Sequence, residues 1–381
     1  YAQAEENQDF SASLSAIKDR YYEIIVGLGI DLSLDQEFDK IEENFKKKEG
    51  RDYAASRGEY LNGLVMAAYL GYEFIDSATV IFFEKDGTFN ADKTNEVLVK
   101  KLKKIKKAVI PGFYGATPDG KVKTFSRGGS DVTGSIVAKA VNADVYENWT
   151  DVSGFLVADP RIIKDPEAIK VITYKELREL SYMGATVLHE DAIFPVRKEG
   201  IPINIRNTNA PQDKGTMIVE STCQVPEHLI TGIAGKKGFV SITIEKDMMN
   251  SEIGFGRKVL QVFEENGISF EHMPSGIDTM TIFVHQDEFV EKEHKVLAEL
   301  HRAVTPDSIE LESDLALVAV VGRGMRATSG VASNIFKALA KAKISVKMID
   351  QGSSELNIIV GVRNAYFENA IKAIYNVFCE K

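Results

Sequence analysis

Apolar residues recur at helical intervals in the first seventy residues of the chain. Between residues 10 and 30, Leu14, Tyr21 and Ile25 fall on one face, which predicts an amphipathic helix. A similar pattern predicts a helix over 56–70, and the charged stretch 40–48 indicates the solvated face of another helix. The first part of the chain is therefore expected to be helical.

Strand-like apolar runs then alternate with helical patterns until about residue 225. The predicted strands are 80–83, 108–113, 144–149 and 201–205, and the predicted helices are 95–106, 130–140 and 174–183. This alternation predicts an α/β domain with a largely parallel sheet.

The last third of the sequence contains an internal repeat. When the chain is shifted by 76 positions, Gly254 falls on Gly330 and Ile268 falls on Ile344, and the register needs no gap. Each copy has the order strand, helix, strand, strand, helix, which becomes a ferredoxin-like βαββαβ pattern once a closing strand is added. The repeat predicts two small modules that are separate from the α/β domain.

The composition of the 381 residues is ordinary for a globular protein, with 44% hydrophobic and 27% charged residues. This length suggests two or three domains. The net charge of −10 argues against nucleic acid as a main partner. Cys223 and Cys379 provide neither a disulfide framework nor a cysteine metal site, so we expect a cytoplasmic protein. No apolar run reaches the roughly 18 residues of a membrane span, so no membrane partner is expected.

A glycine-containing loop over 124–135 connects the predicted strand 108–113 to the helix that follows it. Its paired glycines let the backbone approach a ligand closely. Ser130 or Asp131 is expected to cap the helix, whose free N–H groups favour an anion. Arg127 adds a planar group for a carboxylate or phosphate. The alternative is an ordinary capped turn with a surface arginine.

Glu59 lies in Ser56-Arg57-Gly58-Glu59, just before an apolar helical pattern. One interpretation is a capping box, with Ser56 at the N-cap and Glu59 reaching back to it. The other is a carboxylate that holds a substrate ammonium. With Arg127 on the substrate carboxylate, the pair would suit an amino acid.

Thr150 and Asp151 follow a predicted strand, and Arg161 comes shortly afterwards. Parallel α/β sheets bind ligands beyond the C-terminal ends of their strands, so these side chains are candidates for a phosphate-bearing ligand. An Asx-type turn and a proline turn are the alternative. His189 has no second histidine or cysteine at metal-ligand spacing, which favours a structural role.

The sequence Gly322-Arg323-Gly324 follows a predicted strand and loosely matches a dinucleotide-binding fingerprint. The next helix is predicted to begin near Ser329 or Gly330. The glycines then lie too far from its N-terminus to place a pyrophosphate there, so a nicotinamide site is not expected. A Walker-type nucleotide loop is also absent from the sequence.

Taken together, these motifs resemble the aspartokinases, and the resemblance covers nearly the whole chain. It is carried by Ser56-Arg57-Gly58-Glu59, Gly112-Phe113-Tyr114-Gly115, Ser126-Arg127-Gly128-Gly129-Ser130-Asp131, Trp149-Thr150-Asp151-Val152, Asp159-Pro160-Arg161, Met183-Gly184-Ala185 and the tandem repeat. It implies an amino-acid-kinase fold, a three-layer αβα domain with a mainly parallel sheet, over 1–225. Two ferredoxin-like ACT units, over 226–305 and 306–381, would follow, with strands exchanged between them.

The resemblance also implies phosphorylation of L-aspartate to 4-phospho-L-aspartate by ATP with Mg²⁺, the first step of lysine, threonine and methionine biosynthesis. No metal ligands of the chain itself are expected. The implied roles are Glu59, Phe113, Arg127 and Gly128 at the substrate, Ser130 and Asp131 at the transferring phosphoryl group, and Thr150, Asp151 and Arg161 at the nucleotide.

Three departures from the family pattern concern the nucleotide and the phosphoryl group. The family begins with a strand and a Lys-Phe-Gly-Gly loop that this chain lacks, so its natural beginning is expected to be missing. Thr186 stands where many relatives have a lysine, and Leu156 stands at a position that is aromatic in the family.

Two alternative functions remain open. One is a different amino-acid kinase, acting on glutamate, acetylglutamate or a nucleotide, and the other is a catalytically silent amino-acid sensor.

The first ACT unit resembles the lysine site of lysine-sensitive aspartokinases. The matching residues are Met249, Gly254, Phe255, Ser269, Phe270 and Glu271. The resemblance implies that Glu271 pairs with the ammonium of a lysine inhibitor, and that ACT units pair across subunits in a homodimer or larger assembly. The alternative is that Glu271 is a solvated strand residue.

Overall fold

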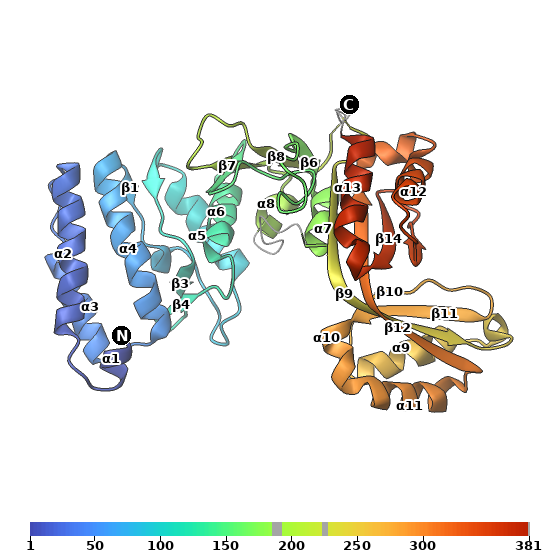
Figure 1. Ribbon diagram of the computed structural model, residues 1–381. Helices are drawn as coiled ribbons and strands as arrows, with labels where there is room; N and C mark the ends of the chain where they lie inside the picture. Colours follow the sequence, from blue (N-terminus) through green and yellow to red (C-terminus); the bar gives the residue numbers. More distant parts are fainter. Residues whose placement is uncertain (185–192, 223–227, 380–381) are drawn as a thin grey trace. The chain divides into compact units, whose positions relative to one another are not determined.

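The computed structural model describes residues 1–184, 193–222 and 228–379. The chain divides into two compact units (Figure 1). Unit 1 comprises Tyr1–Asn148 and Leu188–Asn204, and unit 2 comprises Trp149–Val187 and Ile205–Lys381. Among the described residues, none of the helices has both the length and the apolar character needed to cross a membrane.

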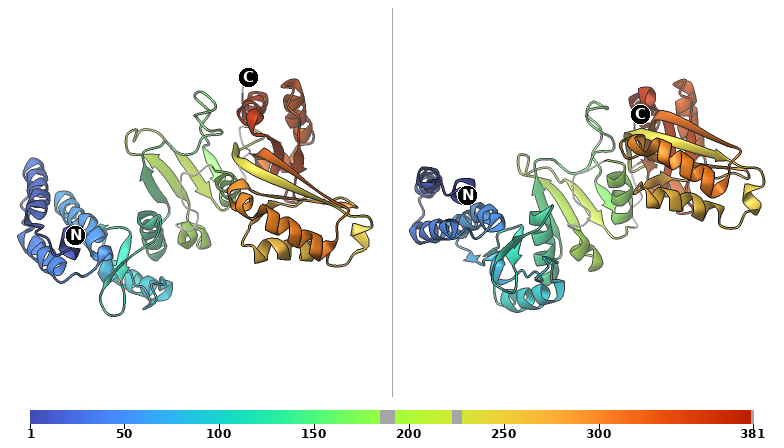
Figure 2. Two further views of the ribbon diagram at one scale, coloured as in Figure 1. Left: turned by 60° about the horizontal axis from the view of Figure 1, so that its bottom comes forward. Right: turned by 90° about the horizontal axis from the view of Figure 1, so that it is seen from below.

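Unit 1 begins with a run of helices (Figures 1 and 2). The three longest of them share one apolar cluster. The helices are α1 (Ala2–Glu5), α2 (Ser11–Leu28), α3 (Asp35–Lys46) and α4 (Arg51–Leu70). Ile25 of α2, Phe38 of α3 and Leu61 of α4 lie in this cluster, which confirms the predicted helical start. The helix α4 begins at Arg51, five residues before the predicted position.

The rest of unit 1 consists of short strands, three α-helices and one short 3-10 helix among the described residues. The elements are β1 (Glu73–Phe74), η1 (Ser77–Thr79), α5 (Ala91–Leu102), β2 (Ala108–Val109), β3 (Tyr114–Ala116), β4 (Val122–Thr124), α6 (Gly129–Ala140) and α8 (Phe194–Lys198). Strands β1 and β2 are parallel, whereas β3 and β4 form an antiparallel hairpin.

The predicted strand over 80–83 is wrong. Phe82 and Phe83 form only isolated bridges, to Ala116 and Phe89. The backbone N–H of Phe82 donates instead to the side-chain oxygen of Thr94 at 2.9 Å. The apolar run is buried against α5 and α6, so its hydrophobicity reflects burial rather than a strand ladder.

Strands β5 (Tyr146–Thr150) and β7 (Ile203–Asn207) each pass from one unit to the other. They belong to a sheet with the order β5-β7-β8-β6. Strand β6 (Val171–Thr173) is parallel to β8 (Thr216–Val219) and leads directly into helix α7 (Tyr174–Tyr182). Thr173 and Glu176 form a capping box that fixes the start of α7.

The C-terminal part of unit 2 is a six-stranded sheet with the order β10-β11-β9-β12-β14-β13 (Figure 1). Its two long central strands are β9 (Gly232–Glu245) and β12 (Ser308–Val321). Because they are antiparallel, the start of β9 pairs with the end of β12, and the end of β9 pairs with the start of β12. Each module therefore contains part of both strands.

The predicted repeat is confirmed in its first strand and first helix. The remaining elements are α9 (Phe255–Glu265), β10 (Phe270–His272), β11 (Thr279–His285), α10 (Gln286–Phe289), α11 (Glu293–Val304), η5 (Arg323–Ala327), α12 (Val331–Lys341), β13 (Met348–Asp350), β14 (Asn357–Arg363) and α13 (Phe367–Phe378). Helices α9 and α12 lie 76 positions apart at both ends. The hairpin β13–β14 is displaced by two further residues relative to β10–β11. Because side chains alternate with period two, the same face stays buried in β11 and β14, whereas Phe270 of β10 is exposed and its counterpart Met348 of β13 is buried.

Candidate active site and regulatory site

The glycine loop reaches helix α6 without a side-chain cap. Gly128 is the N-cap residue, with φ of 54°, and Gly129 is the first residue of α6. The predicted capping by Ser130 or Asp131 is therefore wrong, because both residues lie inside the first turn. A left-handed glycine allows the helix to begin earlier than the side chains suggested. The first-turn N–H groups are left uncapped by side chains, as an anion site requires.

The second glycine of the pair is needed for close packing. A Cβ atom on Gly129 would lie 2.6 Å from Cβ of Phe113. The side-chain oxygen of Thr133 accepts from the N–H of Phe113 at 3.0 Å and donates to the carbonyl of Gly129 at 2.8 Å. Thr133, which the sequence did not single out, thus ties the Phe113 loop to the start of α6.

The Asp131 carboxylate is held by a residue of strand β5. Nδ2 of Asn148 donates to Oδ1 of Asp131 at 2.8 Å and lies 3.0 Å from the hydroxyl of Tyr146. Burial raises the pKa of Tyr146 to about 12, although the Asn148 contact lowers it, so this hydroxyl is neutral at physiological pH. Asn148 could not be identified as a site residue from the sequence, because its position in the predicted strand 144–149 was the only signal for it.

Glu59 lies in the middle of helix α4, so the capping-box interpretation is wrong. The Ser56 hydroxyl donates to the carbonyl of Tyr53 at 2.7 Å, as expected within a helix. Glu59 and Ser130 line the same cavity of unit 1, which has a volume of about 570 Å³. Gly112 also lines it, and a Cβ atom there would lie 3.0 Å from Oγ of Ser130. The structure thus brings Glu59 to the start of α6.

Helix α4 is fastened to the hairpin that precedes Arg127. The carboxylate of Asp52 accepts from Nζ of Lys123 and from the hydroxyl of Thr124, each at 2.8 Å. Lys123 and Thr124 end strand β4, and Arg127 follows three residues later. Arg127 itself is exposed and forms no hydrogen bond or ion pair with any described residue, so its guanidinium is available to a ligand.

The predicted nucleotide residues Thr150, Asp151 and Arg161 lie in unit 2. The carbonyl of Thr150 accepts from the N–H and the hydroxyl of Thr208, at 2.8 and 2.9 Å. The hydroxyl of Thr150 donates to Asp151 at 3.2 Å. These bonds fix the backbone at the end of β5 and leave the Asp151 side chain exposed.

Arg161 forms an ion pair with Asp159. Nη2 of Arg161 lies 2.6 Å from Oδ2 of Asp159, and the backbone N–H of Arg161 donates to Oδ1 at 2.8 Å. The guanidinium holds the pKa of the Asp159 carboxyl below its usual range. The predicted Asx-type turn is therefore present. The Arg161 side chain is 87% exposed, so a phosphate can reach it.

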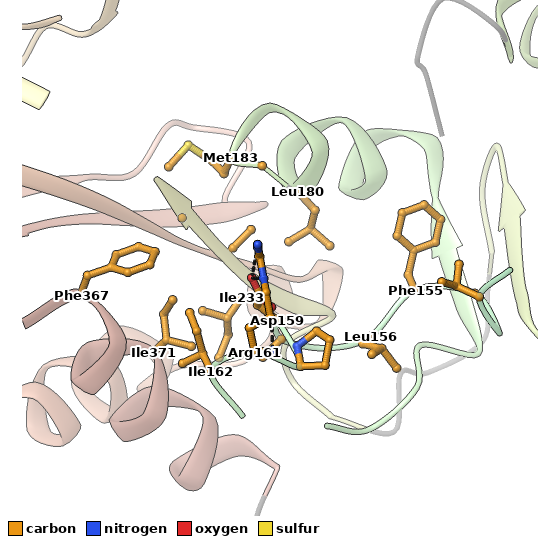
Figure 3. A pocket seen from close by; sticks show the side chains of 17 residues that line it. Phe155, Leu156, Asp159, Arg161, Ile162, Leu180, Met183, Ile233, Phe367 and Ile371 are labelled. Carbon is orange, nitrogen blue, oxygen red and sulfur yellow. Dashed lines mark hydrogen bonds and ion pairs between the residues drawn. The ribbon is translucent and has the colours of Figure 1, made fainter. Parts of the chain in front are cut away.

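A cavity of about 400 Å³ in unit 2 includes this ion pair in its wall (Figure 3). Leu156 lines it from the loop after β5, Leu180 from α7, and Met183 from the C-cap position directly after α7. Phe367 and Ile371 of α13 complete it from the second ACT module. Thr186 and His189 lie outside the described residues. No group of three or more histidine, cysteine or acidic side chains suited to a metal occurs in the described part of the chain.

Among the predicted regulatory residues in the first ACT module, Met249 and Phe255 are buried, whereas Gly254, Ser269 and Phe270 are exposed. Met249 is 5% and Phe255 is 3% exposed, and Gly254 is the left-handed N-cap of α9, with φ of 83°. The N–H of Ser269 donates to Glu288 at 3.2 Å, whereas Phe270 is largely exposed.

Glu271 is not a solvated strand residue, because its side chain is only 8% exposed. Its Oε1 lies 3.3 Å from Nε2 of His285 on the neighbouring strand. Burial and a hydrogen bond to Glu271 raise the pKa of Tyr182 to about 12. Glu271 therefore offers a sheltered negative charge to a cation.

Comparisons with known proteins identify relatives of both parts of the chain. Residues 4–207 match the amino acid kinase family, and residues 318–378 match an ACT domain. Aspartokinase 3 of Bacillus subtilis is 39% identical over 336 residues, which are 86% of this chain and 74% of that protein. Chloroplastic aspartokinase 1 of Arabidopsis thaliana is 29% identical, over 87% of this chain and 61% of its own.

Solved structures extend the likeness to nearly the whole fold. The aspartate kinase of Clostridium acetobutylicum is 54% identical, with a TM-score of 0.90 over 99% of this chain and 87% of its own. Escherichia coli aspartokinase III, at 22% identity and a TM-score of 0.67, shares the fold over 96% of this chain and 86% of its own. The predicted fold is thereby confirmed, and the chain belongs to the aspartokinase family, whose members are phosphotransferases.

Proposed function

We propose that this aspartate kinase transfers the γ-phosphoryl group of ATP to the β-carboxylate of L-aspartate at the glycine loop, and that lysine inhibits the reaction. The observation that carries the proposal is the shared cavity of Glu59 and Ser130, next to the uncapped start of α6. A carboxylate beside a set of N–H donors suits a substrate that has both an ammonium group and anionic groups.

The substrate would be held by opposite charges. Glu59 would receive the α-ammonium, and the unpaired guanidinium of Arg127 would receive a carboxylate through paired hydrogen bonds. Gly128 gives the loop its left-handed turn, and Phe113 is fixed against Gly129 by Thr133. This pair of opposite charges suits an amino acid.

The chemical step would depend on positioning and charge. An oxygen of the β-carboxylate attacks the γ-phosphorus of ATP, its new P–O bond forms, and the bond to the bridging oxygen breaks to release ADP. The first-turn N–H groups of α6, including those of Ser130 and Asp131, would stabilise the negative charge of the transferring group. The Asn148 contact would keep the Asp131 carboxylate in a fixed orientation.

Thr150, Asp151 and Arg161 would serve the nucleotide, with Arg161 exchanging Asp159 for a phosphate. Magnesium would arrive with ATP, since Mg²⁺ commonly keeps water and phosphate ligands and needs few protein carboxylates. Escherichia coli aspartokinase III, solved in complex with aspartate and ADP, supports this ligand pair by its shared fold alone.

Lysine would bind the first ACT module, with its ammonium at Glu271 and its carboxylate near the start of α9. The buried carboxylate and the left-handed Gly254 support this placement. The same Escherichia coli enzyme has been solved in complex with lysine and aspartate. We also propose that the ACT units of two chains pair with each other, which gives a homodimer or a larger assembly.

The substrate proposal is tested by measuring ADP release with aspartate and with glutamate, at equal protein and saturating ATP and Mg²⁺. We expect kcat/KM for aspartate to exceed that for glutamate by about 100-fold or more, because an additional methylene displaces the reacting carboxylate. Trapping the acyl phosphate with hydroxylamine confirms the product. Equal rates with glutamate would reject aspartate as the specific substrate.

A further inference from the structure

Helix α7 contains a buried carboxylate that the proposed reaction does not use. The side chain of Glu176 has no exposed surface. It accepts hydrogen bonds from the N–H and the hydroxyl of Thr173, at 2.9 and 2.7 Å, and from the hydroxyl of Thr231. Burial alone would raise the pKa of the Glu176 carboxyl, but these donors outweigh it and hold the pKa below its usual range.

The remaining donors come from Arg323 in the second ACT module. The backbone N–H of Arg323 lies 2.9 Å from Oε1 of Glu176, and Nη1 of Arg323 lies 2.9 Å from Oε2. The Arg323 side chain is 16% exposed. The two residues are 147 positions apart in the sequence, so this ion pair joins the kinase sequence to the ACT sheet.

The glycines on either side of Arg323 explain how it reaches Glu176. A Cβ atom on Gly322 would lie 2.7 Å from Cα of Ile230, and one on Gly324 would lie 2.7 Å from the carbonyl oxygen of Leu229. Only glycine therefore lets this turn pack against the segment that leads into β9. The motif that resembles a dinucleotide fingerprint binds a carboxylate of the same chain.

The same helix continues along the second ACT module towards the cavity of Figure 3. The carboxylate of Glu179 accepts from Nδ2 of Asn357 on β14. A Cβ atom on Gly232 would lie 2.8 Å from Cδ1 of Leu180, so β9 packs closely against α7. Leu180 then lines the cavity that Arg161 also lines (Figure 3). The ion pair and the cavity wall are thus about one helical turn apart on one rigid element.

We propose that Glu176 and Arg323 are positioning residues that fix α7, and with it the wall of the Arg161 cavity, to the second ACT module. A change in the ACT sheet would then reach the nucleotide residues through α7. This step rests on the proposed nucleotide role of Arg161. It differs from a general stabilising role because it requires an effect on ATP in a protein that remains folded.

The experiment compares Glu176→Gln and Arg323→Lys with the control Arg326→Gln. Arg326 lies on the same turn and is exposed. We expect Glu176→Gln to raise KM for ATP at least about fivefold, while kcat and KM for aspartate stay within about twofold. Arg323→Lys keeps the charge but loses the planar fork, so a smaller rise is expected. The control should behave like the unsubstituted enzyme.

Arg161→Ala separates this inference from the function on which it rests. Thermal unfolding first checks that the positioning variants Glu176→Gln and Arg323→Lys are folded. If Arg161→Ala raises KM for ATP while both of these folded variants leave it unchanged, the positioning role is overturned. If Glu176→Gln raises KM for ATP and Arg161→Ala does not, the nucleotide role of Arg161 fails and the positioning role stands. Should Glu176→Gln not fold, Arg323→Lys decides in its place.

A second measurement addresses the coupling to the effector. The rise in KM for ATP that saturating lysine causes should shrink at least about threefold in Glu176→Gln, while the lysine Kd from calorimetry changes less than about twofold. Undiminished coupling in that variant contradicts the inference. Lysine that fails to bind the unsubstituted enzyme contradicts the proposed inhibitor instead, and the ATP measurements then test the positioning role.

Discussion

The side-chain amide of Asn148 donates a hydrogen bond of 2.8 Å to the Asp131 carboxylate, and so connects strand β5 to the first turn of α6. Replacing Asn148 by alanine should leave the carboxylate free to turn. We expect kcat to fall about 10- to 100-fold, because misplacement of a group near the reacting atoms is costly. The free energy of unfolding should fall by about 1–3 kcal/mol, since the amide is buried. Steady-state kinetics and urea unfolding measure the two effects.

Asp144→Asn is the matched control for this prediction, because Asp144 is exposed just before the same strand. Its kcat should be unchanged. An Asn148→Ala enzyme with full kcat would show that the orientation of Asp131 does not matter for turnover.

Arg127→Ala should reduce kcat/KM for aspartate by the equivalent of about 2–4 kcal/mol, because it removes a charge-assisted pair to the substrate. The thermal midpoint should not change, since Arg127 is exposed and contacts no described side chain through a polar bond. Lys121→Ala, at the exposed tip of the β3–β4 hairpin that precedes Arg127, is the control for a general loss of positive charge. Unchanged aspartate kinetics in Arg127→Ala would remove this residue from the substrate site.

Glu59→Gln should raise KM for aspartate at least about tenfold while leaving the thermal midpoint within about a degree. The reason is that Glu59 lies within α4 and does not cap it, so its charge is not needed for the helix. Glu43→Gln on the exposed face of α3 controls for surface charge. A lower thermal midpoint with an unchanged KM would point to a structural role instead.

Glu271→Gln should weaken lysine binding at least about tenfold, because the buried carboxylate is the partner of the lysine ammonium. The uninhibited kcat should be unchanged. Calorimetry with lysine and with threonine, together with inhibition curves, measures the effect, and Glu291→Gln is an exposed control. Binding of threonine without binding of lysine would make threonine the effector. Equal lysine affinity in the unsubstituted protein and in Glu271→Gln would exclude Glu271 from the lysine site.

The stability of the protein should depend on the ionisation of Glu176 in acid. The pKa of its carboxyl is lowered by folding, so its contribution is present above the usual value of 4.5 and is lost as the pH falls through the lower folded value. Glu176→Gln cannot titrate. The difference in free energy of unfolding between the unsubstituted protein and this variant should therefore shrink as the pH falls below the usual value of 4.5. Glu264→Gln serves as the exposed control, and a constant difference would contradict the prediction.

Local sequence patterns were sufficient for features that depend on neighbours in the chain. The spacing of apolar residues located α2 and α7, and the repeat located α9 and α12, because helical periodicity and caps act over a few residues. Glu59, Arg127 and Asp131 could also be identified as candidate site residues from the sequence, because each lies in a short motif at a predicted loop or helix. Their roles as ligands remain predictions.

Tertiary structure decided the features that depend on distant partners. The run at 80–83 is buried without forming a strand, and Gly128 rather than Ser130 begins α6. The crossing of β9 and β12 between modules and the Glu176–Arg323 ion pair join residues far apart in the sequence. A hydrogen-bond partner is chosen by proximity in space, and local periodicity carries no information about which distant donor will fill a buried acceptor. Sequence alone therefore determined the elements and the candidate residues, whereas packing determined which of them meet.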